Sequence, residues 1–273
     1  MNFKEEKMNL VLFIVITFLI SWLSWLPSVL VYFGIIPSGP IQIMGQLAIF
    51  GPFIAAFALT LKNSGKVGAK ALFISGWNVR FNKKWLVVLF LPILISLIAF
   101  LTVSVIEPMN RLQYATPVIM WIPNFIIFYF IGGPFTEEYG WRGYALDRIQ
   151  SRFNALFSSL ILGLIWGLWH LPLFFISGTV QENIPIYEFL LVTVVLSVFY
   201  TWILNNNRDK DGKLNVFLAI MFHAMSNFSS MILPYWVTGL GRWILFILTA
   251  IVVIAICVIY GIKTLTKLAE NQE

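Results

Sequence analysis

The sequence predicts an all-α, polytopic membrane protein, a bundle of about eight transmembrane helices. First, 59% of its 273 residues are apolar and 11% are charged, whereas about a quarter of the residues in a soluble domain are charged. Second, the mean hydropathy is +0.86. Third, the apolar residues form runs of about 17 to 25, the length of helix that crosses a hydrocarbon core of about 30 Å. A soluble globular protein is excluded, and disorder or nucleic-acid binding is disfavoured.

The predicted spans follow one another with short connections. They run roughly from Asn9 to Phe33, Ile41 to Leu61, Trp85 to Ile106, Pro117 to Gly133, Phe153 to Ile176, Ile186 to Leu204, Leu214 to Leu233 and Gly241 to Ile262. The runs are continuously apolar rather than alternating, which favours helices over barrel strands. The longest connection, 62–84, leaves no room for a soluble domain. Residues 1–273 are therefore predicted to form a single transmembrane domain.

Basic residues predict the orientation, because they favour cytoplasmic loops. Lys4 and Lys7 precede the first run as in a signal peptide, but no small-residue cleavage site follows, so that run is expected to remain as a span. With a cytoplasmic N-terminus, all of the 18 Lys and Arg residues except Arg111 and Arg242 lie on the inner side. We expect a multi-pass cell-membrane protein with cytoplasmic N- and C-termini. The single cysteine, Cys257, excludes an intramolecular disulfide and a multi-cysteine metal site.

Ionisable groups within the membrane are costly, so each is a candidate for function. The chain has two histidines, and both lie inside apolar runs: His170 in LIWGLWHLPLFF and His223 in AIMFHAMSNFSS. A third polar cluster, GGPFTEEYGWRGYALDRI, follows the fourth run. A lone histidine there can be a hydrogen-bonded core residue. Two histidines with a pair of glutamates and an asparagine indicate a site.

Helical spacing separates the roles of these residues. Glu138 and Arg142 are four apart, which favours an ion pair and assigns Glu138 a supporting role. Glu137 points about 100° away and has no basic partner at helical spacing, so it is available for proton transfer. His223 and Asn227 are also four apart, so together they can donate hydrogen bonds to an oxyanion. The alternative for that second pair is hydrogen bonding between helices.

The depth of these residues predicts a cavity. Trp166 lies one turn before His170 and is expected to pack against its ring or orient it. Glu137 can meet His170 and His223 only if the fourth helix continues or restarts after 132–134. Polar helix at this depth is tolerated where it lines a water-filled cavity. We therefore predict a cavity that opens to the cytoplasm and is formed by helices four, five and seven.

Three motifs carry a family resemblance. EEYGWR fits Glu-Glu-x-x-x-Arg, WGLWH fits an aromatic residue followed by x-x-x-His, and HAMSN fits His-x-x-x-Asn, in that order and each on its own span. The chain thereby resembles the CPBP family of intramembrane proteases, also called the Abi or type II CAAX prenyl endopeptidase family. The resemblance covers about residues 115–235, the expected catalytic core. Trp166 stands where the family has phenylalanine, so the pocket is expected to differ in shape.

The resemblance implies a role for each catalytic position. Glu137 would be the general base, and His170 would help to hold and activate the attacking water. His223 and Asn227 would stabilise the oxyanion. The implied chemistry is peptide-bond hydrolysis without an acyl-enzyme, which agrees with the lack of a paired serine or cysteine nucleophile in the sequence.

The resemblance also implies a supporting pair and leaves the metal open. Glu138 with Arg142 would support the site. Family descriptions often say metalloprotease, and either glutamate with His170 and His223 would supply three ligands of a catalytic zinc ion. However, the sequence has no His-Glu-x-x-His helix, and an asparagine beside His223 suits an oxyanion hole equally well. The cofactor, including zinc, therefore stays undecided at this point.

The leading functional hypothesis is an intramembrane endopeptidase that acts on a membrane-associated peptide or a lipidated protein. Its partners would be the lipid bilayer and that substrate, with no nucleic acid. The family includes CAAX-type prenyl-protein processing enzymes and members linked to bacteriocin self-immunity or peptide maturation; a bacteriocin or a small secreted precursor is the preferred target. Two alternatives remain: a non-catalytic peptide-binding immunity protein, and a transporter with a proton or cation pathway.

Overall fold

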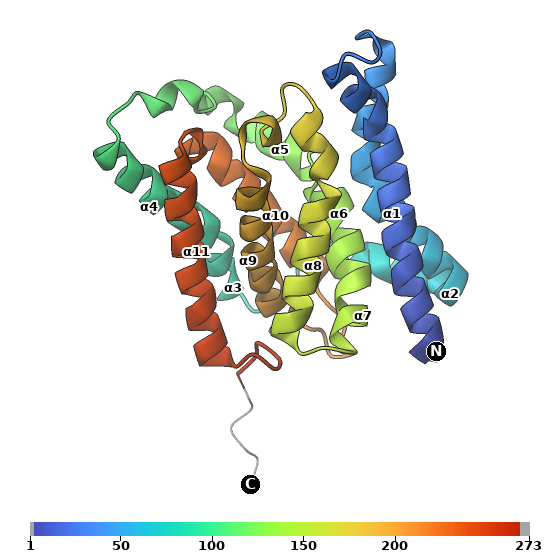
Figure 1. Cartoon of the computed structure of the whole chain (residues 1–273). Helices are drawn as coiled ribbons and strands as arrows, with labels where there is room; N and C mark the ends of the chain where they lie inside the picture. The colour runs from blue at the N-terminus through green and yellow to red at the C-terminus, as the bar shows by residue number, and fades with distance from the viewer. Residues whose placement is uncertain (1–2, 268–273) are drawn as a thin grey trace.

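The computed structural model describes residues 3–267, apart from the side chains of 3–7, 111 and 112 (Figure 1). The described chain is helical and contains no strand, which confirms the predicted all-α, polytopic class. The side chains of Lys4, Lys7 and Arg111, on which part of the predicted orientation depends, lie outside the described residues.

The α-helices differ greatly in length, and short 3₁₀ segments join several of them. They are α1 (Phe3–Tyr32), α2 (Gly51–Ser75), α3 (Trp85–Leu89), α4 (Leu91–Ile106), α5 (Trp121–Ile131), α6 (Pro134–Gly140), α7 (Leu146–Gln150), α8 (Ala155–Trp169), α9 (Ile186–Asn205), α10 (Val216–Ile232) and α11 (Gly239–Tyr260). A 3₁₀ segment, η1 (Pro40–Phe50), leads into α2, and η5 (Leu171–Phe175) and η7 (Tyr235–Val237) follow α8 and α10.

Six helical segments of the described chain are long and apolar enough to cross a membrane. They are Met8–Tyr32, Pro40–Ser75, Val118–Gln150, Ala155–Phe175, Ile186–Asn205 and Gly239–Tyr260. The third and seventh predicted runs correspond to the shorter apolar helices Leu91–Ile106 and Val216–Ile232. All eight apolar runs are thus helical, although two are below spanning length.

The second span differs from its prediction at its end. Helix α2 continues to Ser75, well into the connection expected at 62–84, and it kinks at Gly65, where φ is 62°. Backbone hydrogen bonds hold a helix together without apolar side chains, so the helix outlasts the apolar run. Glycine tolerates this positive φ, which is costly for other residues.

The fourth span breaks and restarts directly before the polar cluster. Helix α5 ends at Ile131, and α6 begins at Pro134 after Gly133, whose φ is 112°. Proline at a helix start lacks only an N–H group that would have no helical partner there. A π-helical turn, Trp141–Ala145, then joins α6 to α7. The break places Glu137 in the new helix.

The two ends of the bundle carry different connections (Figure 1). At one end, Ala155 donates its backbone N–H to the carbonyl of Lys263 over 2.9 Å, and Arg208 pairs with Asp147 over 2.6 Å. We call this the basic end; it carries the connections 146–154, 205–215 and 261–267. The connections 107–117, 176–185 and 233–238 lie at the other end, which we call the opposite end.

Close packing against α9 fixes the position of the C-terminal half of α8. Gly163 and Gly167 lie one turn apart on α8, and a Cβ atom on either would collide with residues of α9 around Thr193. Ser159, one turn earlier, donates a hydrogen bond to Thr201 of α9 over 2.7 Å. Small residues at this spacing allow two membrane helices to approach closely.

Gly133→Ala is expected to damage both the fold and the site. Alanine at φ 112° is strained by about 1 to 3 kcal/mol, and its methyl group would collide with the carboxylate of Glu137. We expect a lower thermal midpoint in detergent and displacement of Glu137.

Gly178→Ala is the matched control, since Gly178 also has a positive φ but has open space around it. Equal loss in the two variants would show that backbone strain alone, not contact with Glu137, makes Gly133 necessary.

Candidate active site

The predicted site residues come together from four elements. Helix α6 carries Glu137 and Glu138, the π-helical turn carries Arg142, and His170 caps the C-terminus of α8. Helix α10 carries His223 and Asn227. The first five are buried, and Asn227 is partly buried.

The Glu138 carboxylate holds two basic groups. Its Oε1 atom accepts hydrogen bonds from Arg142 Nη1 over 3.0 Å and from His223 Nδ1 over 2.7 Å. The bond to Arg142 is the predicted one. The bond to His223, 85 positions along the chain, is an addition that no local spacing could reveal. Because a carboxylate only accepts, Nδ1 carries the hydrogen, and Nε2 of His223 is left for the cavity.

Aromatic rings enclose the Arg142 guanidinium, which is fully buried. Its Cζ atom lies 4.5 Å from the centre of the Trp166 ring and 3.9 Å from that of Tyr200. Cation–π attraction stabilises a charge that has left water. Tyr200 was not among the predicted residues, because one tyrosine in an aromatic-rich chain gives no pattern.

Glu137 lies apart from this charged cluster. Its Oε2 atom accepts a hydrogen bond from the indole Nε1 of Trp166 over 2.7 Å. No described side chain donates to Oε1. Glu137 is thus held in place by Trp166 and has no basic partner on its own helix, as the spacing predicted; the contact with Trp166, 29 positions away, was not predicted.

Trp166 links the two histidines to Glu137. Its carbonyl oxygen lies 2.8 Å from His170 Nδ1, and its ring meets those of His170 and His223 edge to face at 5.5 and 5.4 Å. A carbonyl only accepts, so Nδ1 of His170 carries the hydrogen and Nε2 has a lone pair. Trp166 therefore orients His170, in agreement with its expected role.

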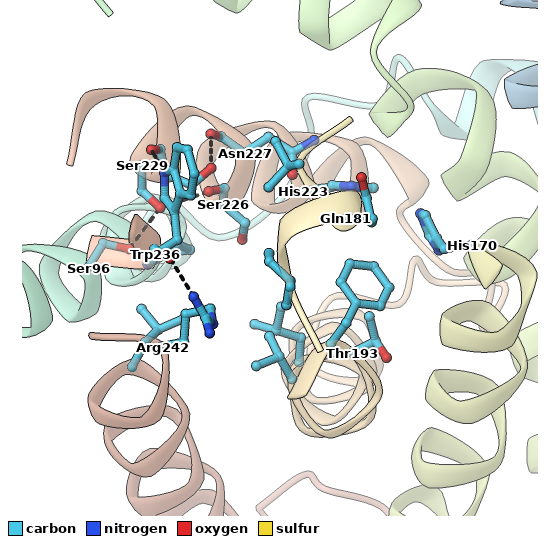
Figure 2. Close-up of a pocket in the computed structure, with 18 of the residues that line it drawn as sticks. Ser96, His170, Gln181, Thr193, His223, Ser226, Asn227, Ser229, Trp236 and Arg242 are labelled. Atoms are coloured by element: carbon cyan, nitrogen blue, oxygen red, sulfur yellow. Dashed lines mark hydrogen bonds between the residues drawn. The ribbon is translucent and has the colours of Figure 1, made fainter. Parts of the chain in front are cut away.

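A cavity of about 540 Å³ brings the catalytic candidates together. Glu137, His170, His223 and Asn227 all line it, whereas Glu138 and Arg142 do not. Figure 2 shows His170 on one side of the cavity, with His223 and Asn227 above. The division between lining and non-lining residues coincides with the division into catalytic and supporting roles that the family resemblance implies.

The walls of the cavity differ from the expectation. Residues of α4, α9 and α11 line it too, so helices four, five and seven form only part of it. It extends to Tyr114, Gln181 and Tyr235 at the opposite end, and no residue of the connections at the basic end lines it. The expected opening to the cytoplasm stays a prediction.

The donor groups do not fit a three-ligand zinc site. Among the described residues, no three His, Cys, Asp or Glu side chains come close enough to hold one metal ion. Glu138 and His223 bond to each other, and Nδ1 of His170 is held by a backbone carbonyl. The chemistry of the site is therefore derived from the protein side chains and water.

Comparisons with known proteins agree with this geometry. The family model described as Type II CAAX prenyl endopeptidase Rce1-like matches residues 119–229, the stretch that contains all six site residues. CAAX prenyl protease 2 of Methanococcus maripaludis is 27% identical over 239 residues, which cover 83% of this chain and 86% of that protein. Lysostaphin resistance protein A of Staphylococcus haemolyticus is 25% identical over 188 residues, 69% of this chain and 49% of that protein.

The matched stretch includes the three motifs and the polar cluster that they form in the fold. Over this stretch the chain is similar to the type II CAAX prenyl endopeptidases, which supports the predicted resemblance to the CPBP family and, at family level, a CAAX-type intramembrane protease.

Proposed function

We propose that this protein is an intramembrane endopeptidase that hydrolyses a peptide bond of a membrane-associated peptide with water activated by Glu137. The observation that carries the proposal is the shared cavity: Glu137, His170, His223 and Asn227 line it from three helices. The charged pair Glu138–Arg142 lies behind them.

Glu137 and His170 activate the water. The bond from Trp166 holds one oxygen of Glu137, and Oε1 takes a proton from the water as its oxygen attacks the carbonyl carbon of the substrate. Nε2 of His170 accepts a hydrogen bond from the remaining O–H group. When the C–N bond breaks, Glu137 returns the proton to the departing amine, so protons and charge balance.

His223 and Asn227 stabilise the negative charge on the substrate oxygen. Both side chains can donate to it from α10, one turn apart. With hydrogens on both ring nitrogens, His223 donates from Nδ1 to the Glu138 carboxylate and from Nε2 to the oxyanion. No side chain forms a covalent intermediate, and Cys257 lies outside the cavity.

The cavity favours an apolar substrate. Aromatic and aliphatic side chains such as Trp169, Phe189 and Phe246 form most of its wall, and such walls bind hydrophobic or lipidated molecules. The names of the two relatives, one a prenyl protease and the other a resistance protein, support two settings. These are CAAX-type processing, and peptide maturation or bacteriocin self-immunity at a cell membrane.

A second candidate function is peptide binding without cleavage. It is favoured by the name of the Staphylococcus haemolyticus relative, which states resistance and no catalytic activity. The transporter alternative gains no support, because no residue of the connections at the basic end lines the cavity.

Glu137→Gln should abolish cleavage while the fold persists. The amide oxygen still accepts the Trp166 hydrogen bond, but it cannot take a proton, so we expect at least a 10²-fold loss in kcat, the usual size of a general-base contribution. The measurement is cleavage of a prenylated CAAX peptide in detergent, together with the thermal midpoint.

Glu182→Gln is the matched control, because Glu182 lies outside the cavity wall. If the Glu137→Gln protein kept the wild-type rate, the protease mechanism would be wrong. Binding without turnover by the unaltered protein would favour the second candidate function.

Glu138→Ala should instead destabilise the protein. Removing the carboxylate leaves the buried Arg142 without its ion pair, which costs about 3 to 5 kcal/mol when one partner of a buried pair is lost. Asp147→Ala is the comparison, since its pair with Arg208 is partly exposed and contributes at most about 1 kcal/mol. Similar thermal midpoints for the two variants would contradict the supporting role of Glu138.

The cavity mouth should face the outside of the cell if the basic end is cytoplasmic. In a Cys257→Ser background, Val180→Cys at the opposite end should react with a membrane-impermeant maleimide in intact cells. Lys210→Cys, at the basic end, should react only after permeabilisation. The reverse labelling pattern would place the basic end and both termini outside.

A further inference from the structure

An ion pair at the opposite end of the cavity has no role in the chemistry described so far. Arg242 of α11 donates from Nε to Glu188 Oε2 of α9 over 2.5 Å, and from Nη1 to the Trp236 carbonyl over 2.9 Å. Both charged side chains line the cavity, and Figure 2 shows Arg242 and Trp236 on the side away from His170. The side chains of Arg242 and Glu188 are 16% and 9% exposed, so the pair is largely buried.

The pair leaves one donor and one acceptor available. Nη2 of Arg242 donates no hydrogen bond to the described residues. Oε1 of Glu188 has the hydroxyl of Tyr187 at 3.5 Å, too far for a strong bond. Because both side chains line the cavity, these two atoms can reach a molecule within it.

The neutrality of the pair limits what it can bind. A charged side chain bound there would leave an unbalanced charge in an apolar cavity, which is costly. A peptide group is neutral and offers one N–H donor and one C=O acceptor. It therefore complements a free carboxylate oxygen and a free guanidinium N–H.

We propose that Glu188 and Arg242 bind a backbone amide group of the substrate and so position its peptide bond at Glu137. This inference depends on the proposed function. It adds a contact to the backbone of an extended substrate, which does not depend on the substrate's side chains. Glu188 and Arg242 act as positioning residues, because they bind the substrate away from the reacting atoms.

The length of α10 sets where along the substrate this contact falls. From His223 to Ile232 the helix rises about 13 Å at 1.5 Å per residue, and Trp236 follows shortly after. An extended peptide covers about 3.4 Å per residue. The amide bound by the ion pair should therefore lie about four residues from the scissile bond.

The test replaces single amide bonds of the substrate by esters, which removes the N–H donor at one position. The probe is a prenylated CAAX peptide, with an ester placed in turn three to six residues from the scissile bond on either side. Its Kd is measured on the Glu137→Gln protein, where it is not cut. We expect one ester position to weaken binding about tenfold, or 1.4 kcal/mol.

The double variant Glu188→Gln, Arg242→Gln separates binding from structure. It keeps the size of Glu188, shortens Arg242 and removes both charges, so the ester effect should fall below about twofold. Arg208→Gln, which removes a cation from the basic end, is the matched control and should keep the full effect. The thermal midpoint of each variant shows whether loss of the ion pair between α9 and α11 destabilises the protein.

The outcomes distinguish this inference from the proposed function. If no ester position matters, or if the effect persists in the double variant, the amide contact is wrong and the pair only joins two helices. If the unaltered protein binds the amide peptide with the ester effect but does not cut it, the protease function fails and the contact stands. If the peptide does not bind at all, both are overturned.

Discussion

The Glu138 carboxylate is the interaction on which the site depends. It is fully buried, and it balances Arg142 on its own chain segment while it holds His223 from α10. Without it, a guanidinium would lie in the membrane interior with only aromatic rings around it, at a cost of several kcal/mol. The carboxylate thus joins the restarted fourth span to the seventh, and it fixes which nitrogen of His223 faces the cavity.

A neutral framework around this charge positions the remaining groups. Gly163 and Gly167 bring α8 against α9, and this packing places Trp166 where its indole reaches Glu137 and its carbonyl reaches His170. One residue therefore orients both the proposed base and the histidine proposed to hold the water. The Glu138–Arg142 pair lies outside the cavity lining, whereas the groups that the proposed reaction needs line it.

The sequence predicted what depends on local spacing. The apolar runs located the long helices but not α6 and α7, and the four-residue spacing predicted the Glu138–Arg142 pair. A fourth helix that continues or restarts after 132–134 was expected, because Glu137 had to lie at the depth of the histidines, and the structure shows the restart. The contacts of Trp166 with Glu137 and of His223 with Glu138 join residues 29 and 85 positions apart, so no local pattern encodes them. The set of helices around the cavity was predicted only in part, because α4, α9 and α11 also line it and no local pattern places them there.

The packing beneath the site has a consequence for the cell. A cavity that admits water deep into a membrane protein shortens the barrier that ions must cross, and each charge moved through 100 mV of potential releases about 2.3 kcal/mol. Trp141, Tyr144 and Tyr200 are buried and do not line the cavity, and neither does any connection at the basic end. Packed side chains therefore separate the cavity from the basic end, and we expect hydrolysis inside the bilayer to leave the ion gradients of the membrane intact.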